Sequence, residues 1–185
     1  FTHFDKVFNE LSGKTWGIAG LGSIGRRVAD VAKAFGCRVV YFSASGHTYD
    51  TEFKRVSFDE LLENSDIISI HAPLNDKTNN LFDDAAFAKM KKNAVLLNLG
   101  RGPIVNNAAL TKALKENIIA GAGLDVIDKE PIAADNPLLE IQDSSKLIIT
   151  PHIAWATYEA RVRLMDEVYE NIKAFEAGES RNAVV

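Results

Sequence analysis

The chain has 185 residues, of which 46% are apolar, and its 21 basic and 25 acidic residues give a net charge of −4. This apolar fraction supports a folded core in one domain and argues against intrinsic disorder. There is no basic stripe and no apolar stretch approaches a membrane span, so neither nucleic acid nor a membrane is expected as a partner.

The N-terminal stretch 1–10 has no clear hydrophobic period, and the chain begins with Phe1 rather than Met. We interpret 1–10 as the remnant of a hinge or linker that follows an earlier domain of a longer protein. The single cysteine, Cys37, has no second thiol with which to form an internal disulfide. We therefore expect Cys37 to be a buried residue that fills space in the core, and we expect the protein to lie in the reducing cytoplasm.

The most informative stretch is Gly20-Leu21-Gly22-Ser23-Ile24-Gly25. The apolar run 15–19 before it predicts a strand, and the amphipathic run 26–35 after it predicts a helix. In a dinucleotide-binding turn, one glycine permits the tight turn, the second lets the backbone approach a pyrophosphate, and the third packs helix against strand. The N–H groups at the start of the helix then face the phosphates. An ordinary glycine-containing turn is the alternative.

Strands and helices alternate along the rest of the chain. Further strands are predicted at 38–42, 66–70, 94–97, 118–124 and 147–149. Further helices are predicted around 57–62 and at 84–90, 108–115 and 158–177. Because most of the strands are apolar throughout, the sequence predicts an α/β fold with a doubly wound parallel sheet, covered by helices on both faces.

Two of the helices show an apolar face by residue spacing. The first helix carries Val28, Val31, Ala32 and Phe35 at this spacing. The last helix carries Val162, Met165, Val168, Tyr169, Ile172 and Phe175, with Thr157 as its predicted N-cap and Gly178 at its end.

Polar or unusual residues follow six of the predicted strands. They are the glycine turn, Ser43, the run His71-Ala72-Pro73, the run Asn98-Leu99-Gly100-Arg101, Asp125 and His152. In open parallel sheets, ligands bind outside the carboxyl ends of the strands. The sequence therefore predicts a binding site along this edge of the sheet.

Three residues near this edge suggest chemistry. Arg101 offers a planar guanidinium that can grip a substrate carboxylate, although a surface arginine paired with a carboxylate is the alternative. His152 is a candidate general acid and base, and its alternative is a structural histidine. Glu130 is a solvated loop residue unless it reaches His152, where it would fix the imidazole tautomer and raise its pKa.

The motifs together resemble the D-isomer-specific 2-hydroxyacid dehydrogenases over nearly the whole chain. The resemblance rests on Gly-Leu-Gly-Ser-Ile-Gly, Asn98-Leu99-Gly100-Arg101-Gly102, Gly123-Leu124-Asp125-Val126, Glu130-Pro131 and Thr150-Pro151-His152-Ile153-Ala154-Trp155, in this order. It implies a Rossmann-like dinucleotide-binding domain over 1–185, with 178–185 starting a return to a substrate domain that is mostly absent. The histidine motif with Trp155 resembles that of the hydroxypyruvate reductases (glycerate dehydrogenases). The alternative interpretation is that Trp155 packs in the core or at an interface.

The resemblance also implies roles for individual residues. Arg101 would bind and polarise a 2-keto acid, His152 would exchange the proton with the substrate oxygen, and Glu130 would hold His152. No metal is implied. The residues assigned to the cofactor are Gly20, Gly22, Ser23, Ile24, Gly25, Ser43, His71, Ala72, Pro73, Thr78, Asn98, Leu99, Gly100, Asp125 and Ala154.

Ser43 departs from the family pattern, because an aspartate usually stands there to bind the ribose 2′-hydroxyl of NAD. No arginine follows at once to hold a 2′-phosphate, and Lys54 and Arg55 lie too far along the sequence to be assigned. NAD is the expected cofactor, with NADP left open.

The expected function is hydride transfer between a nicotinamide cofactor and a small D-2-hydroxy acid or 2-keto acid of the hydroxypyruvate or glyoxylate type. A homodimer is expected from the resemblance, and the chain by itself is expected to bind cofactor with little or no turnover. The alternative is a corepressor-like protein of the same fold that senses NAD(H).

Overall fold

The computed structural model describes residues 8–183, so most of the predicted hinge remnant, 1–7, lies outside the described residues. The chain forms two units, Phe1–Thr150 and Pro151–Val185.

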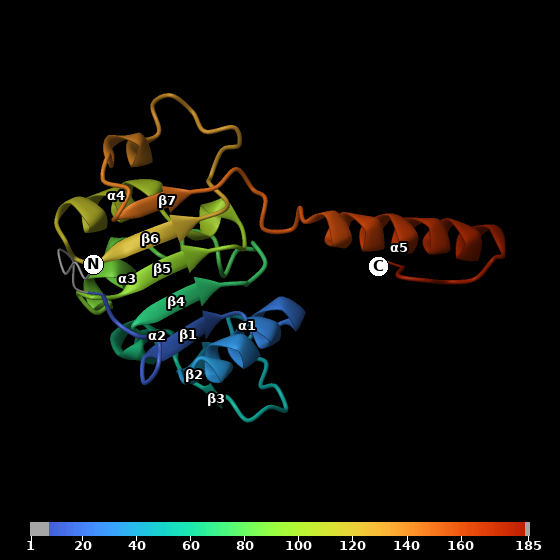
Figure 1. Ribbon diagram of the computed structural model, residues 1–185, viewed down its shortest axis with the longest axis horizontal. Coiled ribbons are helices and arrows are strands. Elements are labelled where there is room, and N and C mark those ends of the chain that lie inside the picture. The colour runs from blue at the N-terminus through green and yellow to red at the C-terminus, as the bar shows by residue number, and fades with distance from the viewer. Residues whose placement is uncertain (1–7, 184–185) are drawn as a thin grey trace, which may run out of the picture. The chain divides into compact units, whose positions relative to one another are not determined.

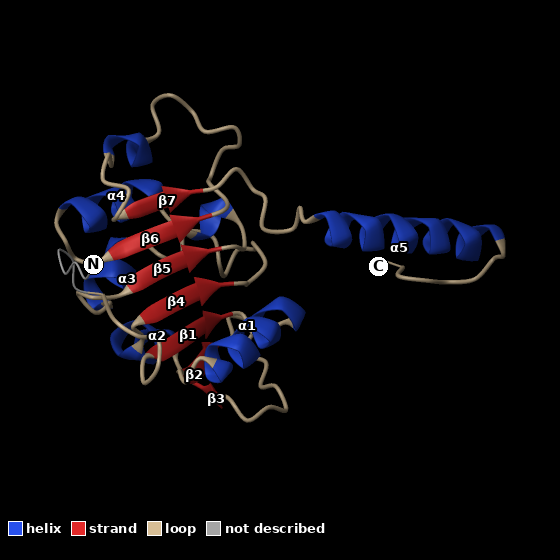
Figure 2. Ribbon diagram, in the orientation of Figure 1, coloured by secondary structure: helices blue, strands red, loops and turns tan. Residues whose placement is uncertain are grey.

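The first unit is built on one parallel sheet of seven strands in the order β3-β2-β1-β4-β5-β6-β7. Figure 2 shows all of these strands pointing the same way. The strand order reverses between β1 and β4, so this pair forms the switch point of a doubly wound sheet. The strands are β1 (Thr15–Ala19), β2 (Arg38–Phe42), β3 (Lys54–Arg55), β4 (Ile67–Ile70), β5 (Val95–Asn98), β6 (Gly121–Leu124) and β7 (Leu147–Ile149).

Helices cover both faces of the sheet, as the sequence predicts (Figure 1). Helix α1 (Ser23–Ala34) lies on one face, and α2 (Phe58–Asn64), α3 (Asp84–Lys89) and α4 (Asn107–Lys115) lie on the other. Right-handed crossovers produce this division, because the chain runs in opposite directions from the switch point in its two halves. The short helices η1 (Gly102–Ile104) and η2 (Pro137–Glu140) follow β5 and β6.

Two separate apolar clusters form the core of this unit. The larger cluster lies under α2, α3 and α4 and includes Phe82, Phe87 and Leu110. The smaller one lies under α1 and consists of Ile18, Leu21, Ala29 and Tyr41.

The buried face of α1 differs from the one its apolar spacing predicts. Gly25, Ala29 and Ala32 are buried, whereas Val31 and Phe35 are 56% and 60% exposed. Small residues let the helix approach the sheet closely, and the larger apolar residues on the adjacent stripe are left outside.

The second unit contains α5 (Tyr158–Glu176). The predicted cap is confirmed, because the Thr157 hydroxyl accepts a hydrogen bond from the Ala160 N–H at 3.3 Å. Gly178 follows the helix with a φ of +72°. The predicted apolar residues of α5 are exposed, including Met165 and Phe175. Within residues 8–183, no helix combines the length and apolar character that a membrane span needs.

Candidate cofactor-binding site

The glycine turn between β1 and α1 has the close approaches that its three glycines predict. Gly20 has a φ of +100°, and a Cβ atom there would lie 2.6 Å from the backbone N of Ala72. A Cβ atom on Gly25 would lie 2.2 Å from the Gly20 carbonyl oxygen. A Cβ atom on Gly22 would meet nothing within 4 Å. Gly20 and Gly25 therefore allow the close backbone approaches within the turn, and the open space beside Gly22 is where the predicted pyrophosphate would lie.

The start of α1 suits an anionic ligand. Gly22 is the N-cap and supplies no capping side chain, and the first turn contains no acidic residue. The first N–H groups of a helix have no partner inside the helix and carry its positive dipole end. Ser23 and Ile24 are the first residues of this turn, at the position where the cofactor phosphates would lie.

A pocket of about 430 Å³ opens beside the turn at the carboxyl ends of β4 and β5. Ile24, Leu74 and Leu99 are large apolar side chains there, each more than 40% exposed. Such exposed apolar surface, next to a few polar groups, is typical of a site for a flat cofactor ring. The lining residues are Ile24, His71, Ala72, Pro73, Leu74, Leu99, Gly100 and Arg101. The structure thus brings together predicted residues from three segments of the chain.

The loop after β5 presents Arg101 to this pocket. Asn98 is fully buried, its side-chain oxygen accepts a hydrogen bond from the Gly100 N–H, and its Nδ2 donates to the Arg101 carbonyl, both at 3.1 Å. The Arg101 Nη1 donates to the Gly100 carbonyl at 2.8 Å. Asn98 therefore shapes the loop that carries Arg101, and its predicted contact with the cofactor stays a prediction.

Thr78 is also fully buried and supports the pocket from within. Its hydroxyl donates to the Pro73 carbonyl at 2.6 Å and accepts from the Asn75 N–H at 2.9 Å. These bonds fix the turn that presents Ala72 and Pro73. The predicted cofactor-binding role of Thr78 stays a prediction, and its geometry favours an indirect one.

His71 is held neutral by its surroundings. Its Nε2 lies 3.0 Å from the Ser69 hydroxyl, which also accepts a hydrogen bond from the Trp16 indole N–H at 2.9 Å. Its Nδ1 is buried and finds no hydrogen-bond partner among the described residues. Burial lowers the pKa of the His71 imidazole to about 4, because the charged form loses its hydration.

We expect this histidine to make the stability of the domain pH-dependent. Between about pH 6.5 and pH 4 the unfolded chain binds a proton at His71 that the folded chain does not, so the free energy of unfolding falls as the pH falls through this window. Denaturant titrations of His71→Gln at pH 7 and pH 4.5 should show a smaller loss between the two pH values than the parent protein shows. His47→Gln, at an exposed imidazole, is the control. An equal loss in the parent and in His71→Gln would contradict the prediction.

The loop after β6 is tied to the loop that carries Arg101. A Cβ atom on Gly102 would lie 1.9 Å from the carbonyl carbon and oxygen of Ile127, so the two backbones touch. The Glu130 carboxylate accepts a hydrogen bond from the Ile127 N–H at 3.2 Å. Asp125, at the end of β6, is buried and accepts a hydrogen bond from the Thr150 hydroxyl at 2.6 Å.

His152 and Ala154 belong to the second unit. His152 has a φ of +54°, which is uncommon for a residue with a side chain and is found more often at functional sites. Its carbonyl accepts a hydrogen bond from the Trp155 indole N–H at 2.9 Å, which gives Trp155 a structural role within this motif. The arrangement of Arg101, Glu130 and His152 as one catalytic group stays a prediction.

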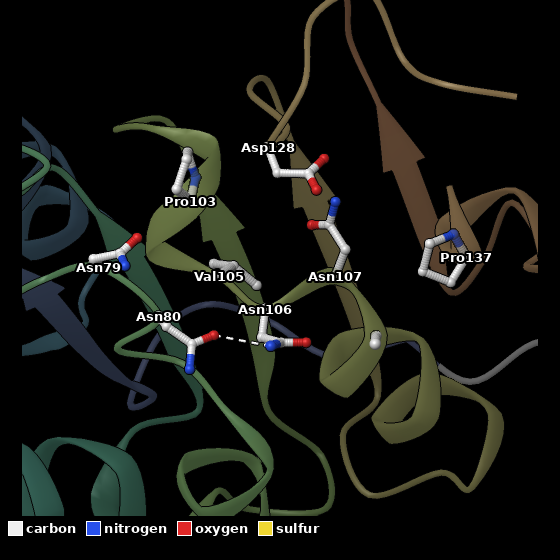
Figure 3. Close-up of a pocket in the computed structure, with 9 residues that line it drawn as sticks. Asn79, Asn80, Pro103, Val105, Asn106, Asn107, Asp128 and Pro137 are labelled. Atoms are coloured by element: carbon white, nitrogen blue, oxygen red, sulfur yellow. Dashed lines mark hydrogen bonds between the residues drawn. The ribbon is translucent and has the colours of Figure 1, made fainter. Parts of the chain in front are cut away.

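A second pocket of the first unit is lined by nine residues, four of which are asparagines (Figure 3). Asn106 caps α4 by accepting a hydrogen bond from the Ala109 N–H, and its Nδ2 donates to the Asn80 side-chain oxygen, both at 2.9 Å. The Asn107 side chain points toward Asp128 in Figure 3, but its buried Nδ2 has no hydrogen-bond partner among the described residues. None of the predicted site residues lines this pocket.

The fold, the glycine turn and the neighbouring pocket together define a dinucleotide-binding domain. Residues 2–154 match the model of the family described as D-isomer specific 2-hydroxyacid dehydrogenase, NAD binding domain. The chain belongs to this family, and the predicted Rossmann-like fold is confirmed.

Curated relatives support the same assignment. The chain is 42% identical over 173 residues to a glyoxylate reductase of Korarchaeum cryptofilum, covering 92% of this chain and 51% of the relative. It is 39% identical over 184 residues to a glycerate dehydrogenase of Methylorubrum extorquens, covering 100% of this chain and 57% of the relative. The chain therefore spans about half the length of the curated relatives it matches.

Solved structures with either form of the cofactor are similar to this chain. An acyclic imino acid reductase in complex with NADPH and D-Arg superposes with a TM-score of 0.89 at 35% identity, covering 100% of this chain and 59% of that one. A D-lactate dehydrogenase of Lactobacillus jensenii with NAD+ superposes with a TM-score of 0.88 at 32% identity, covering 100% of this chain and 59% of that one. These relatives are enzymes, which supports the enzymatic interpretation over the sensor alternative.

Proposed function

We propose that this chain is the cofactor domain of an enzyme that transfers a hydride between a nicotinamide cofactor and a small D-2-hydroxy acid or 2-keto acid, of the hydroxypyruvate or glyoxylate type. One observation carries the proposal: the Arg101 loop and the glycine turn open onto the same pocket. A guanidinium beside the predicted nicotinamide position is where an acid substrate needs its carboxylate held. The relatives named glyoxylate reductase and glycerate dehydrogenase support the substrate class.

Each residue in the proposal has a distinct task. The space beside Gly22 and the N-terminus of α1 would hold the pyrophosphate, and the apolar wall of the pocket would hold the nicotinamide ring. The bound cofactor supplies or accepts the hydride. Arg101 would orient the substrate by its carboxylate, and His152 would give or take the proton at the substrate oxygen. Glu130 would act as a positioning residue by holding the His152 imidazole.

The organisation of the whole protein is also a proposal. We propose that 1–185 is the dinucleotide-binding domain and that 178–185 begins the return to a substrate domain. The match to only about half of each relative supports this division. We further propose a homodimer in the cytoplasm, and the single, buried thiol of Cys37 fits a reducing compartment.

The proposal is tested by comparing the 185-residue chain with the full-length protein. We expect both to bind NADH or NADPH in a calorimetric titration, and only the full-length protein to reduce hydroxypyruvate or glyoxylate at an appreciable rate. Chemistry of this kind needs a closed cleft that excludes water, which one domain alone does not provide. Failure of the full-length protein to reduce any small 2-keto acid, despite cofactor binding, would overturn the proposed activity.

A further inference from the structure

The end of β2, where a dinucleotide-binding domain meets the adenosine ribose, has no carboxylate in this chain. Ser43 stands at this position and is buried, and the segment 43–48 contains no acidic residue. The Gly46 N–H donates to the Ser43 carbonyl at 3.0 Å, so the segment begins with a hydrogen-bonded turn. The Ser43 and Ser45 hydroxyl oxygens lie 3.1 Å apart in this turn. The loop therefore presents neutral hydrogen-bonding groups where a carboxylate would repel a phosphate.

The edge strand β3 (Lys54–Arg55) brings Arg55 to this turn, although Arg55 lies twelve positions after Ser43 in the sequence. Arg55 pairs in register with Tyr41, just before the end of β2. Its Nη1 donates to the Thr48 hydroxyl at 3.0 Å, and its Nη2 lies 3.8 Å from the position of a Cβ atom on Gly46. Among the residues that the structure describes, Arg55 makes no ion pair with a carboxylate. Its charge is therefore available to a ligand at the turn.

A second guanidinium lies on the α1 side of the same loop. The Arg26 Cζ is 4.8 Å from the centre of the Tyr49 ring, and the Tyr49 N–H donates to the buried Tyr41 hydroxyl at 3.0 Å. The loop is thus anchored to β2, and Arg26 and Arg55 both contact residues of it or beside it. Farther along the loop, Glu52 is already paired with Lys33.

We propose that the Ser43–Thr48 loop binds the 2′-phosphate of NADP(H), and that Arg55 is the residue that selects this cofactor over NAD(H). The inference rests on the proposed function, since it concerns the adenosine end of the same cofactor site. Serine hydroxyls donate to phosphate oxygens, and a guanidinium adds a charge-assisted, bidentate contact. NAD(H), by contrast, would find no carboxylate for its free 2′-hydroxyl. Arg55 acts from an edge strand, which is why its position in the sequence does not reveal the role.

Lys54 provides a matched control on the same strand. Neighbouring residues of a strand point to opposite faces of the sheet, so Lys54 points away from the face of Arg55. The Ser57 hydrogen bonds and, to a smaller extent, the Lys54 charge lower the pKa of Glu60 at the start of α2, which places Lys54 on the α2 side. Lys54→Gln therefore removes the same charge from the same strand without touching the turn.

The test uses two nucleotide probes that require no turnover, 2′,5′-ADP and 5′-AMP, in calorimetric titrations of the protein. We expect 2′,5′-ADP to bind more tightly than 5′-AMP, and Arg55→Gln to weaken 2′,5′-ADP by about 10- to 100-fold while leaving 5′-AMP unchanged. Lys54→Gln should leave the ratio of the two dissociation constants unchanged. The difference in affinity between 2′,5′-ADP and 5′-AMP should also decrease at high salt, because salt screens charges at an exposed site.

A second variant adds a carboxylate to the turn instead of removing a guanidinium. Ser43→Asp should lower the affinity for 2′,5′-ADP and raise that for NADH, because it introduces the carboxylate that the ribose hydroxyl requires. Equal binding of both probes by the parent protein, or an unchanged ratio in Arg55→Gln with its melting temperature retained, would overturn the inference and leave the proposed enzyme in place. Binding of neither probe would overturn the cofactor site itself, and the inference with it.

Discussion

Replacing His152 by alanine in the full-length protein is expected to lower kcat for 2-keto acid reduction by about 10²–10⁴-fold, the usual contribution of a positioned general acid. The substrate oxygen must gain a proton as the hydride reaches the carbon that bears it, and the His152 imidazole is the group proposed to donate this proton. The measurement is steady-state kinetics with hydroxypyruvate and glyoxylate. NADH or NADPH binding should be retained, because His152 is not assigned to the cofactor.

The variant Glu130→Gln tests whether Glu130 positions the proposed acid, His152. If Glu130 holds the His152 imidazole, we expect the variant to move the pH profile of kcat/KM to lower pH, because the protonated imidazole loses a neighbouring negative charge. A residue with only a structural role would lower the rate without moving the profile. Unchanged turnover in His152→Ala would eliminate His152 as the acid.

The second large effect is expected at Arg101. Arg101→Gln should lower kcat/KM for the 2-keto acid by about 10²–10³-fold, because the substrate carboxylate loses a charged, two-pronged partner. Cofactor affinity should change little, since the buried Asn98 side chain still holds the loop through Gly100 and the Arg101 carbonyl.

Arg101→Lys is the control for charge alone. Lysine keeps the positive charge but lacks the planar fork, so we expect it to recover only part of the loss. Full recovery by lysine would show that charge suffices. A loss confined to cofactor affinity would place Arg101 at the cofactor rather than at the substrate.

The sequence predicts the strands of this fold well because each long strand is an apolar run. It misses β3, where Lys54–Arg55 forms a two-residue edge strand with no apolar signal. It also extends β6 too far toward the N-terminus, because the apolar Ile118 and Ile119 precede a strand that begins at Gly121. Apolar content alone does not distinguish a strand from a buried connection.

The binding edge was predictable because parallel strands place their carboxyl ends along one side of the sheet. The tasks of individual side chains were harder to predict from the sequence. Asn98 lies at the end of β5 and Thr78 in the loop after β4, yet their polar groups turn inward and hold loops in place. The meeting of Arg55 with the turn after β2 depends on tertiary pairing, which no local pattern in the sequence encodes.

The backbone contact between Gly102 and Ile127 has a consequence for how such an enzyme can evolve. The residue proposed to grip the substrate directly precedes Gly102, and the residue proposed to position the acid is hydrogen-bonded to Ile127. With no room for even a methyl group between these segments, a shift of one must carry the other with it. New substrates are therefore more readily accommodated by changes in the proposed substrate domain than by movement of Arg101.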